Sequence, residues 1–256
     1  LHNCIFKING SPRWPDLLIL GGRGLGKNGY ISFEDFCLLT PTNGIRNYHI
    51  DICATSEDQA KTSFDEIWDI LEHSKYRKKL EKNFYWTKTE IRNRKTNSKL
   101  RYRTNNAKGK DSLRTGKVDF DEVHAYENWK NINVFTTGLG KKPHPRKTYA
   151  TTNGEITDGV LDELLSKGEM ILREEIPDNG FLPFICKLDN EDEVNDPSNF
   201  VKANPSLPYF QDLMEEVLKE WEDYKLNPSI HTDFMTKRMN IRKTSNVQAV
   251  AQIEDI

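Results

Sequence analysis

Residues 16–28 read DLLILGGRGLGKN, a short apolar run that leads directly into a glycine-rich loop. Four residues separate Gly21 from Gly26 and Lys27, which is the spacing of a phosphate-binding loop, or Walker A motif. In such a loop the glycines let backbone N–H groups converge on phosphate oxygens, and the lysine reaches the outer phosphates. Residues 30–39 follow with apolar side chains at helical spacing. Strand, glycine loop and helix in this order predict a nucleotide-binding site.

The whole loop is expected to contact ATP. Its last residue departs from the Walker A pattern, because Asn28 stands where Ser or Thr normally ligates Mg²⁺ through a hydroxyl. Asn28 can offer only a neutral amide oxygen, so we expect Mg²⁺ binding there to be weak or shifted. The alternative is a surface turn that binds no ligand. The predicted ATP-binding residues are Gly21, Gly22, Arg23, Gly24, Leu25, Gly26, Lys27 and Asn28.

A second motif lies in residues 117–124, KVDFDEVH, where a short strand pattern closes in two adjacent carboxylates. This pattern is typical of a Walker B motif. Asp121 would then hold Mg²⁺, and Glu122 would polarise the water that attacks the γ-phosphate. An isolated Asp-Glu pair is more often an exposed acidic turn. The glycine-rich loop upstream favours the catalytic interpretation here.

Composition limits the class of protein. The 256 residues are 36% hydrophobic and 30% charged, which suits one large α/β domain with appendages. No apolar run approaches the roughly 18 residues of a membrane span, and no signal-peptide pattern opens the chain, so we expect a soluble protein without a membrane partner. The four cysteines and six histidines lack metal-ligand spacing. We therefore expect reduced thiols, a cytosolic compartment and no zinc.

The formal net charge of −2 hides a basic segment, residues 75–117, which holds 16 Lys or Arg against three acids. Aromatic residues are interleaved with these charges, a composition that suits contact with a nucleic-acid phosphate backbone. An equally weighted alternative is a solvated helix face with a hairpin whose aromatic side chains enter the core. The aromatic residues are Tyr76, Phe84, Tyr85, Trp86 and Tyr102.

Strand and helix patterns alternate along the chain, which predicts a mostly parallel sheet flanked by helices. Strands are expected at residues 47–54, 100–104, 118–121 and 148–152, and amphipathic helices at 56–71, capped by Ser56, and 209–225. Ligand sites in such sheets lie at the carboxyl ends of strands, where both motifs fall. We expect an ATPase domain over residues 1–198 and a helical lid or linker over 199–256.

The motifs together resemble the large terminase subunits of tailed double-stranded DNA bacteriophages. Their order and spacing carry the resemblance, which covers nearly the whole chain. The carriers are GRGLGK at 22–27, ATSEDQA at 54–60, DEVH at 121–124, residues 138–154 with KPHP and YATTNG, ANPSL at 203–207, and MN at 239–240. The resemblance implies a P-loop NTPase of the additional-strand, RecA-like type.

The resemblance also implies a function, which is hydrolysis of ATP with Mg²⁺ to move double-stranded DNA into procapsids. Arg114 is placed like the arginine finger that a neighbouring subunit inserts, and Arg23 is a rival for that catalytic role beside Glu122. Thr151, Thr152 and Asn153 resemble the coupling motif that relays hydrolysis to DNA movement. From the residues alone, a strand end followed by an Asn-Gly turn would be preferred for that segment.

By the same resemblance, the partners would be double-stranded DNA, a portal protein, a small terminase subunit and further copies of the chain in a ring, expected to be a pentamer, in the host cell cytoplasm. The chain stops where the nuclease of such enzymes would begin, so we expect no nuclease domain. Two alternatives stay open: a helicase-like DNA-dependent ATPase, and a DNA-binding protein whose nucleotide site is degenerate at Asn28.

Overall fold

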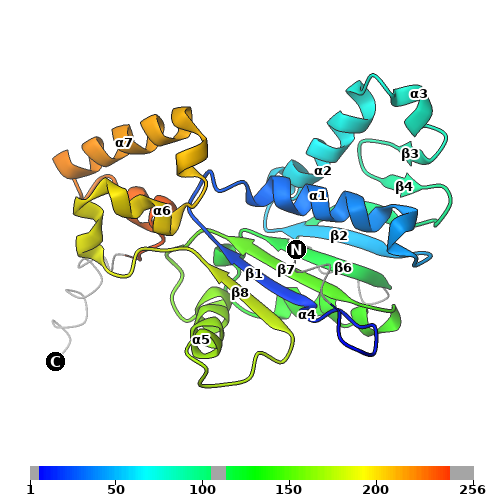
Figure 1. Ribbon diagram of the computed structural model, residues 1–256, viewed down its shortest axis with the longest axis horizontal. Helices are drawn as coiled ribbons and strands as arrows, with labels where there is room; N and C mark the ends of the chain where they lie inside the picture. The colour runs from blue at the N-terminus through cyan, green and yellow to red at the C-terminus, as the bar shows by residue number, and fades with distance from the viewer. Residues whose placement is uncertain (1–5, 105–113, 243–256) are drawn as a thin grey trace. The chain divides into compact units, whose positions relative to one another are not determined.

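The computed structural model describes residues 6–104 and 114–242, and the strands of this part form one mixed sheet (Figure 1). Neighbouring strands follow the order β3-β4-β5-β2-β6-β7-β1-β8. The strand bounds are β1 Asp16–Leu20, β2 His49–Ala54, β3 Phe84–Trp86, β4 Ile91–Asn93, β5 Lys99–Thr104, β6 Thr115–Asp121, β7 Arg146–Thr151 and β8 Phe181–Ile185.

All pairings from β5 across to β8 are parallel, whereas β3 and β4 add an antiparallel hairpin beside β5. This arrangement confirms the mostly parallel α/β prediction. The four strands expected from sequence correspond to β2, β5, β6 and β7, with ends shifted by one to three residues. β8 was not predicted, because Pro183 interrupts its apolar pattern. Among the described strands β8 stands at the edge of the sheet, next to β1, and proline is tolerated in an edge strand.

Helices cover both faces of the sheet (Figure 1). α1 and α2 pack with β2 and β5 around one apolar core that includes Ile50, Phe64 and Leu100, whereas α4 and α5 lie over the opposite face around Phe120 and Tyr149. No helix within the described ranges is both long enough and apolar enough to cross a bilayer. The helix bounds are α1 Lys27–Leu39, α2 Glu57–His73, α3 Arg77–Leu80, α4 Lys130–Thr136, α5 Val160–Leu172, α6 Phe200–Ala203 and α7 Gln211–Leu226.

Local sequence explains where the helices start. Ser56 caps α2 as predicted, because its Oγ accepts the backbone N–H of Gln59 at 3.3 Å. α1 begins at Lys27, earlier than the expected residue 30, directly after Gly26 at φ +90°. A left-handed residue at the helix start is accessible to glycine without a Cβ clash. The glycine-rich loop therefore runs into the first turn of α1 without an intervening segment.

The buried strand β6 alternates between two kinds of side chain. Val118 and Phe120 enter the core with α4 and α5. Lys117 and Asp119 alternate with them, and Lys117 is completely buried: its Nζ lies 2.5 Å from Asp35 Oδ1, 2.6 Å from Asp119 Oδ1 and 3.2 Å from Glu34 Oε2. Burial alone would lower the pKa of Lys117, but these carboxylates outweigh it and raise that pKa well above its usual value. One ammonium group thus ties α1 to the strand that carries the acidic motif.

The described residues divide into two compact units. The first contains the sheet, with α1 to α5. The second contains residues 21–25, 152–155 and the segment from 186 onward, with α6, α7 and an apolar core that includes Phe200, Val217 and Met239. The chain passes between the units after Leu20 and Thr151, the last residues of β1 and β7. The boundary expected at residue 198 falls inside the second unit and stays a prediction about function.

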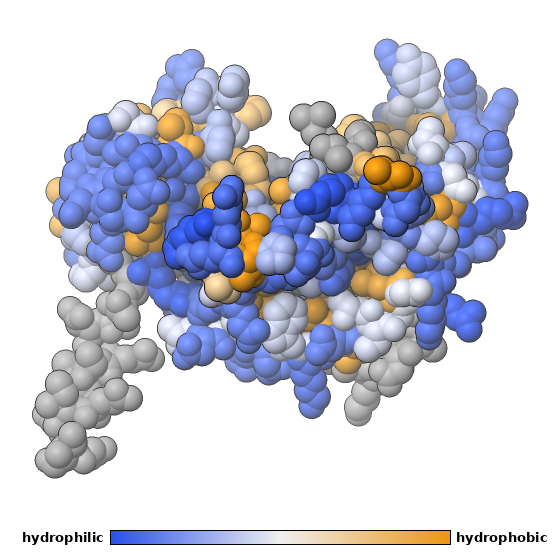
Figure 2. Space-filling view, turned by 60° about the horizontal axis from the view of Figure 1, so that its bottom comes forward, coloured by the Kyte–Doolittle hydropathy of each residue, from blue (hydrophilic) through white to orange (hydrophobic). Residues whose placement is uncertain are grey.

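The surface is strongly polar. On the face shown in Figure 2, hydrophilic side chains surround small, separate apolar patches. This distribution agrees with the 30% of charged residues in the sequence.

The buried cluster around Lys117 generates a stability prediction. Lys117→Met leaves the carboxyl groups of Glu34, Asp35 and Asp119 buried without their cation, so we expect the free energy of unfolding at pH 7.5 to fall by roughly 3–5 kcal/mol. These carboxyls then have folded-state pKa values above their unfolded ones, so the loss shrinks as the pH falls towards about 5. Urea unfolding at both pH values measures this difference.

The matched control is Lys99→Met. Lys99 also pairs with a carboxylate, Glu90 at 3.2 Å, but its side chain is 23% exposed. We expect this variant to lose about 1 kcal/mol or less at either pH. Equal losses in the two variants would contradict the role given to Lys117.

Candidate nucleotide-binding site

Three predicted motifs follow adjacent parallel strands. β6 ends at Asp121, β7 at Thr151 and β1 at Leu20, the residue before the glycine-rich loop. The strands are neighbours in the order β6-β7-β1, with Asp121 opposite Ala150 and Leu20 opposite Thr151. Their carboxyl ends are therefore level at one edge of the sheet. This is the edge where open α/β sheets bind ligands.

The glycine-rich loop needs glycine for two different reasons. Gly24 and Gly26 both have φ +90°, a left-handed conformation that disfavours other residues. A Cβ on Gly22 would lie 2.3 Å from the carbonyl oxygen of Arg238, so a side chain is excluded there by close backbone approach. The loop ends at a 13-residue helix whose N-cap, Gly26, provides no side-chain cap. A helix start of this kind favours an anion such as phosphate.

Lys27 and Asn28 occupy the first two positions of α1. The Lys27 side chain is largely buried, and its positive charge acts on the carboxyl group of Asp121. Asn28 is partly exposed, and its carbonyl oxygen accepts the hydroxyl of Ser32 at 2.8 Å. Both residues therefore stand where a Walker A loop presents its lysine and its metal-ligating side chain.

Asp121 is buried at the end of β6 with 3% of its surface exposed. Its Oδ1 accepts the backbone N–H of Glu122 at 3.0 Å. Burial, helped by repulsion from Glu122, raises the pKa of Asp121 to about 7, although Lys27 opposes the shift. A buried carboxylate of this kind is stabilised by a cation beside it, and Mg²⁺ prefers oxygen ligands of this type. The residues present fit a bound Mg²⁺.

Glu122 adopts a left-handed backbone with φ 51° and ψ 51°, which is costly for a residue with a side chain. Its Oε2 lies 3.0 Å from Nδ1 of His124. That same ring nitrogen lies 2.9 Å from Oγ1 of Thr151, and the backbone N–H of His124 donates to the same hydroxyl at 3.1 Å. His124 thus links the acidic motif to the end of β7. The sequence motif at residues 121–124 includes His124 but gave no sign of its contact with Thr151.

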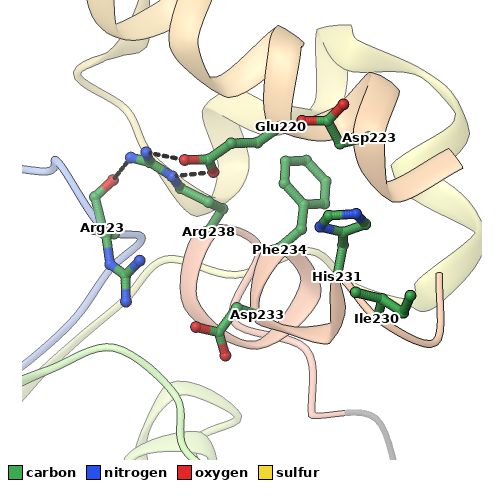
Figure 3. Close-up of a pocket in the computed structure, with 8 residues that line it drawn as sticks. All are labelled: Arg23, Glu220, Asp223, Ile230, His231, Asp233, Phe234 and Arg238. Carbon is green, nitrogen blue, oxygen red and sulfur yellow. Dashed lines mark hydrogen bonds and ion pairs between the residues drawn. The ribbon is translucent and has the colours of Figure 1, made fainter. Parts of the chain in front are cut away.

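Residues 21–25 of the glycine-rich loop belong to the second compact unit, where Arg23 lies near Arg238 (Figure 3). The carbonyl oxygen of Arg23 accepts Nη1 of Arg238 at 2.9 Å, and the N–H of Arg23 donates to the carbonyl of Lys237 at 2.8 Å. The guanidinium of Arg23 extends away from Arg238, and both residues line a cavity of about 270 Å³. Arg238 was not among the predicted site residues.

Residues 152–154, here called the coupling segment after the predicted motif, also contact the C-terminal part of the second unit. Asn153 donates its backbone N–H to Oδ1 of Asn240 at 2.9 Å and its Nδ2 to the carbonyl of Asn240 at 3.0 Å. Lys237 Nζ donates to the carbonyl of Asn153 at 3.0 Å. Thr152 is buried, and its hydroxyl donates to the carbonyl of Asn153 at 3.2 Å. The Asn-Gly segment is therefore a bonded element of this unit.

The predicted arginine finger, Arg114, is exposed directly before β6, at the edge of the described residues. Its exposure is compatible with the predicted action on a neighbouring copy of the chain, which stays a prediction.

The basic segment is divided between core and surface. Phe84, Trp86 and Tyr102 pack in or against the core of α1 and α2, whereas Tyr76 and Tyr85 are exposed. Several cations are held by nearby acids: Arg101 and Lys99 pair with Glu90, and Arg103 with Asp51. On the β3–β4 hairpin, Arg92 and Arg94 stay exposed beside Tyr85. The nucleic-acid interpretation thus fits the exposed cations, and the alternative of a hairpin with core aromatic residues fits the rest. Residues 105–113 of the basic segment lie outside the described ranges.

The chain is similar to known phage proteins in sequence and in fold. The family model for the terminase large subunit ATPase domain matches residues 33–169, which begins after the glycine-rich loop and includes Asp121 and Glu122. The terminase large subunit of Lactococcus phage p2 is 23% identical over 227 residues, 86% of this chain and 40% of that protein. The chain therefore spans less than half the length of this curated relative.

Solved structures show the same fold. The large terminase of bacteriophage HK97 superposes with a TM-score of 0.75 at 18% identity, over 90% of this chain and 47% of that one. An ATPase-domain variant of the Thermus phage P74-26 large terminase gives a TM-score of 0.52 at 15% identity, over 78% of this chain and 85% of that one. These likenesses confirm the RecA-like P-loop fold.

A second family model, for the terminase large subunit endonuclease domain, matches residues 175–256. The expectation that the chain contains no part of a nuclease domain is therefore wrong. It rested on where the resemblance placed the start of the nuclease, and the match begins earlier, at residue 175. Within residues 6–104 and 114–242, no group of three or more His, Cys, Asp or Glu is placed to hold a metal ion. With the ATPase model matching more than half of its length, the chain belongs to the terminase large subunit family.

Proposed function

We propose that this chain hydrolyses ATP in the presence of Mg²⁺ and thereby drives double-stranded DNA into a phage procapsid. The observation that carries the proposal is the placement of the glycine-rich loop, Asp121-Glu122 and Thr151 after three adjacent parallel strands. Membership of the terminase family supports it over a helicase-like enzyme. The hydrolysis experiment below distinguishes the proposed ATPase from a DNA-binding protein with a degenerate nucleotide site.

Each group has a role that its environment supports. Lys27 binds the outer phosphates, and the backbone of residues 21–26 surrounds them. Asp121 and the amide oxygen of Asn28 hold Mg²⁺, which neutralises charge on the phosphates when bound. Glu122 orients and polarises the attacking water. His124, between Glu122 and Thr151, fixes the direction of the Glu122 carboxylate.

A further arginine stabilises the charge that develops on the γ-phosphate. Arg114 is proposed to act from one copy of the chain on the site of the next, because it is exposed and precedes β6. Arg23 is its rival within the same loop. The proposal therefore includes a ring of copies, a pentamer, assembled on a portal protein with a small terminase subunit in the host cytoplasm.

DNA contact is proposed for the exposed cations of the β3–β4 hairpin. Within the described residues, Arg92 and Arg94 form no ion pair with a carboxylate, unlike Arg101. Arg94 Nε donates to the backbone carbonyls of Glu81 and Phe84, and its guanidinium lies 5.7 Å from the Tyr85 ring centroid. Exposed guanidinium groups without a carboxylate partner, beside an exposed aromatic ring, suit a phosphate backbone. The same proposal assigns the ATPase portion to residues 1–198 and a lid or linker to residues 199–256.

Hydrolysis is tested by measuring phosphate release with Mg²⁺ over a range of protein concentrations. We expect wild-type activity per molecule to rise with concentration, because Arg114 acts between copies. Glu122→Gln keeps the size of the side chain but cannot polarise water, so we expect at least about a 100-fold loss of turnover with ATP binding retained. A wild-type protein that binds ATP and DNA without turnover, even as Asn28→Ser, would favour the degenerate site.

The role of Arg114 is tested by mixing two inactive proteins. Arg114→Ala lacks the proposed finger and Glu122→Gln lacks the catalytic carboxylate, so each alone is expected to lose turnover, by about 10³-fold for the arginine. In a mixed assembly some sites receive an intact Arg114 and an intact Glu122, and part of the activity returns. Arg23→Ala in place of Arg114→Ala is the matched control, because a residue acting in its own loop gives no recovery.

A further inference from the structure

We infer that residues 237–242, here called the clasp, position the phosphate-binding loop and the coupling segment together, with Arg238 and Asn240 as the positioning residues. This inference rests on the proposed function. It concerns contacts inside the second compact unit only, to which residues 21–25, 152–155 and the clasp all belong.

Arg238 holds the loop. Its side chain is 4% exposed and donates Nη1 to the carbonyl of Arg23, while Nε and Nη2 donate to Glu220 on α7, both at 2.7 Å (Figure 3). Nη2 also donates to Glu216 at 2.7 Å. A planar guanidinium can satisfy these directions at once, and a lysine ammonium cannot. Arg238 therefore sets where the backbone of Arg23 lies against α7.

The clasp also bonds the loop through its backbone. The N–H of Arg23 donates to the carbonyl of Lys237 at 2.8 Å, and the N–H of Gly22 donates to the carbonyl of Ala203 at 2.8 Å. Asn204 Nδ2 adds a bond to the carbonyl of Arg23 at 3.3 Å. Loop amides and carbonyls that would otherwise be free to rearrange are thus fixed. The N–H groups of Gly22 and Arg23 donate to carbonyls of this unit, so these bonds fix the backbone path of the loop and lower the cost of ordering it when nucleotide binds.

Asn240 holds the coupling segment in turn. It is 1% exposed, accepts two hydrogen bonds from Asn153, through its Oδ1 and its backbone carbonyl, and donates Nδ2 to the carbonyl of Cys186 at 2.7 Å. Arg242 Nε donates to the carbonyl of Gly154 at 2.8 Å. Asn240 has φ +56°, a left-handed conformation that asparagine tolerates better than most residues. Every polar group of its side chain has a partner.

Arg238 and Asn240 are separated by a single residue, so a shift of the loop at Arg23 moves the backbone that carries Asn240. The clasp therefore transmits a change at the phosphate-binding loop to residues 152–154. Lys237 reinforces the connection, because its carbonyl accepts from Arg23 and its Nζ donates to the carbonyl of Asn153. Because Arg238 contacts the loop and Asn240 contacts the coupling segment, we expect changes at Arg238 to alter Kd and KM and changes at Asn240 to alter kcat.

The test compares Arg238→Lys with Asn240→Ala in the whole chain. For Arg238→Lys we expect the Kd of a non-hydrolysable ATP analogue with Mg²⁺, and the KM for ATP, to rise about tenfold, with kcat within twofold of wild type, because the loop is less ordered before binding. For Asn240→Ala we expect kcat to fall about tenfold and Kd to stay within twofold. Fluorescence titration and phosphate release measure the two quantities.

Val217→Ala is the control for a loss of stability alone. Val217 lies in the same apolar core and is not hydrogen-bonded to either segment through its side chain. We expect it to lower the Tm of the protein while leaving Kd, KM and kcat unchanged. Melting curves of all three variants show whether the kinetic changes follow stability.

Two results would overturn the inference: Kd and kcat unchanged in both variants, or the same split of effects in Val217→Ala. If Kd rises and kcat falls together in both clasp variants, the two ends act as one structural unit and the separate roles are wrong. Failure of the proposed function is distinct, since the wild-type protein itself would then release no phosphate, whether or not it binds the analogue.

Discussion

The site depends on the ammonium group of Lys117, which is buried among Glu34, Asp35 and Asp119. Burial raises the pKa values of Asp35 and Asp119, and the same carboxyls keep Lys117 charged. A cluster of this kind contributes little net stability compared with an apolar core. Removing one of its members is strongly destabilising, and the charged groups must keep their relative positions. It fixes the register between α1, which begins with Lys27, and β6, which ends in Asp121. The separation of the two proposed phosphate and metal groups is thereby set.

The second constraint lies where the chain leaves the sheet. After β1 and β7 it enters the other compact unit, where Arg23 and Asn153 both bond to residues 237–240. The proposed phosphate-binding loop is thus held by residues 181 to 215 positions later in the chain. In the first unit, His124 gives a second connection, between Glu122, the proposed catalytic carboxylate, and Thr151.

Local signals predicted much of this arrangement. The apolar run before Gly21, the cap at Ser56 and the strand pattern before Asp121 each depend on residues within a few positions, and the structure confirms all three. β8 was missed because a proline interrupts its pattern, whereas a hairpin in the basic segment was one of two alternatives left open there. Arg238 could not be assigned, since a side-chain contact across 215 positions leaves no periodic signal. His124 was part of the predicted motif, but its contact with Thr151 lies 27 positions away and could not be predicted. The nuclease prediction was wrong because the match to the nuclease model begins earlier than the resemblance placed it.

The account rests on nucleotide binding to the loop at residues 21–28. Hydrogen–deuterium exchange of the chain, with and without Mg²⁺ and a non-hydrolysable ATP analogue, tests this most directly. The account predicts slower exchange at the loop amides in the wild-type protein, and a much weaker effect in Lys27→Ala, which keeps the glycines but lacks the ammonium. Unchanged exchange at residues 21–28, or equal protection in both proteins, would contradict it.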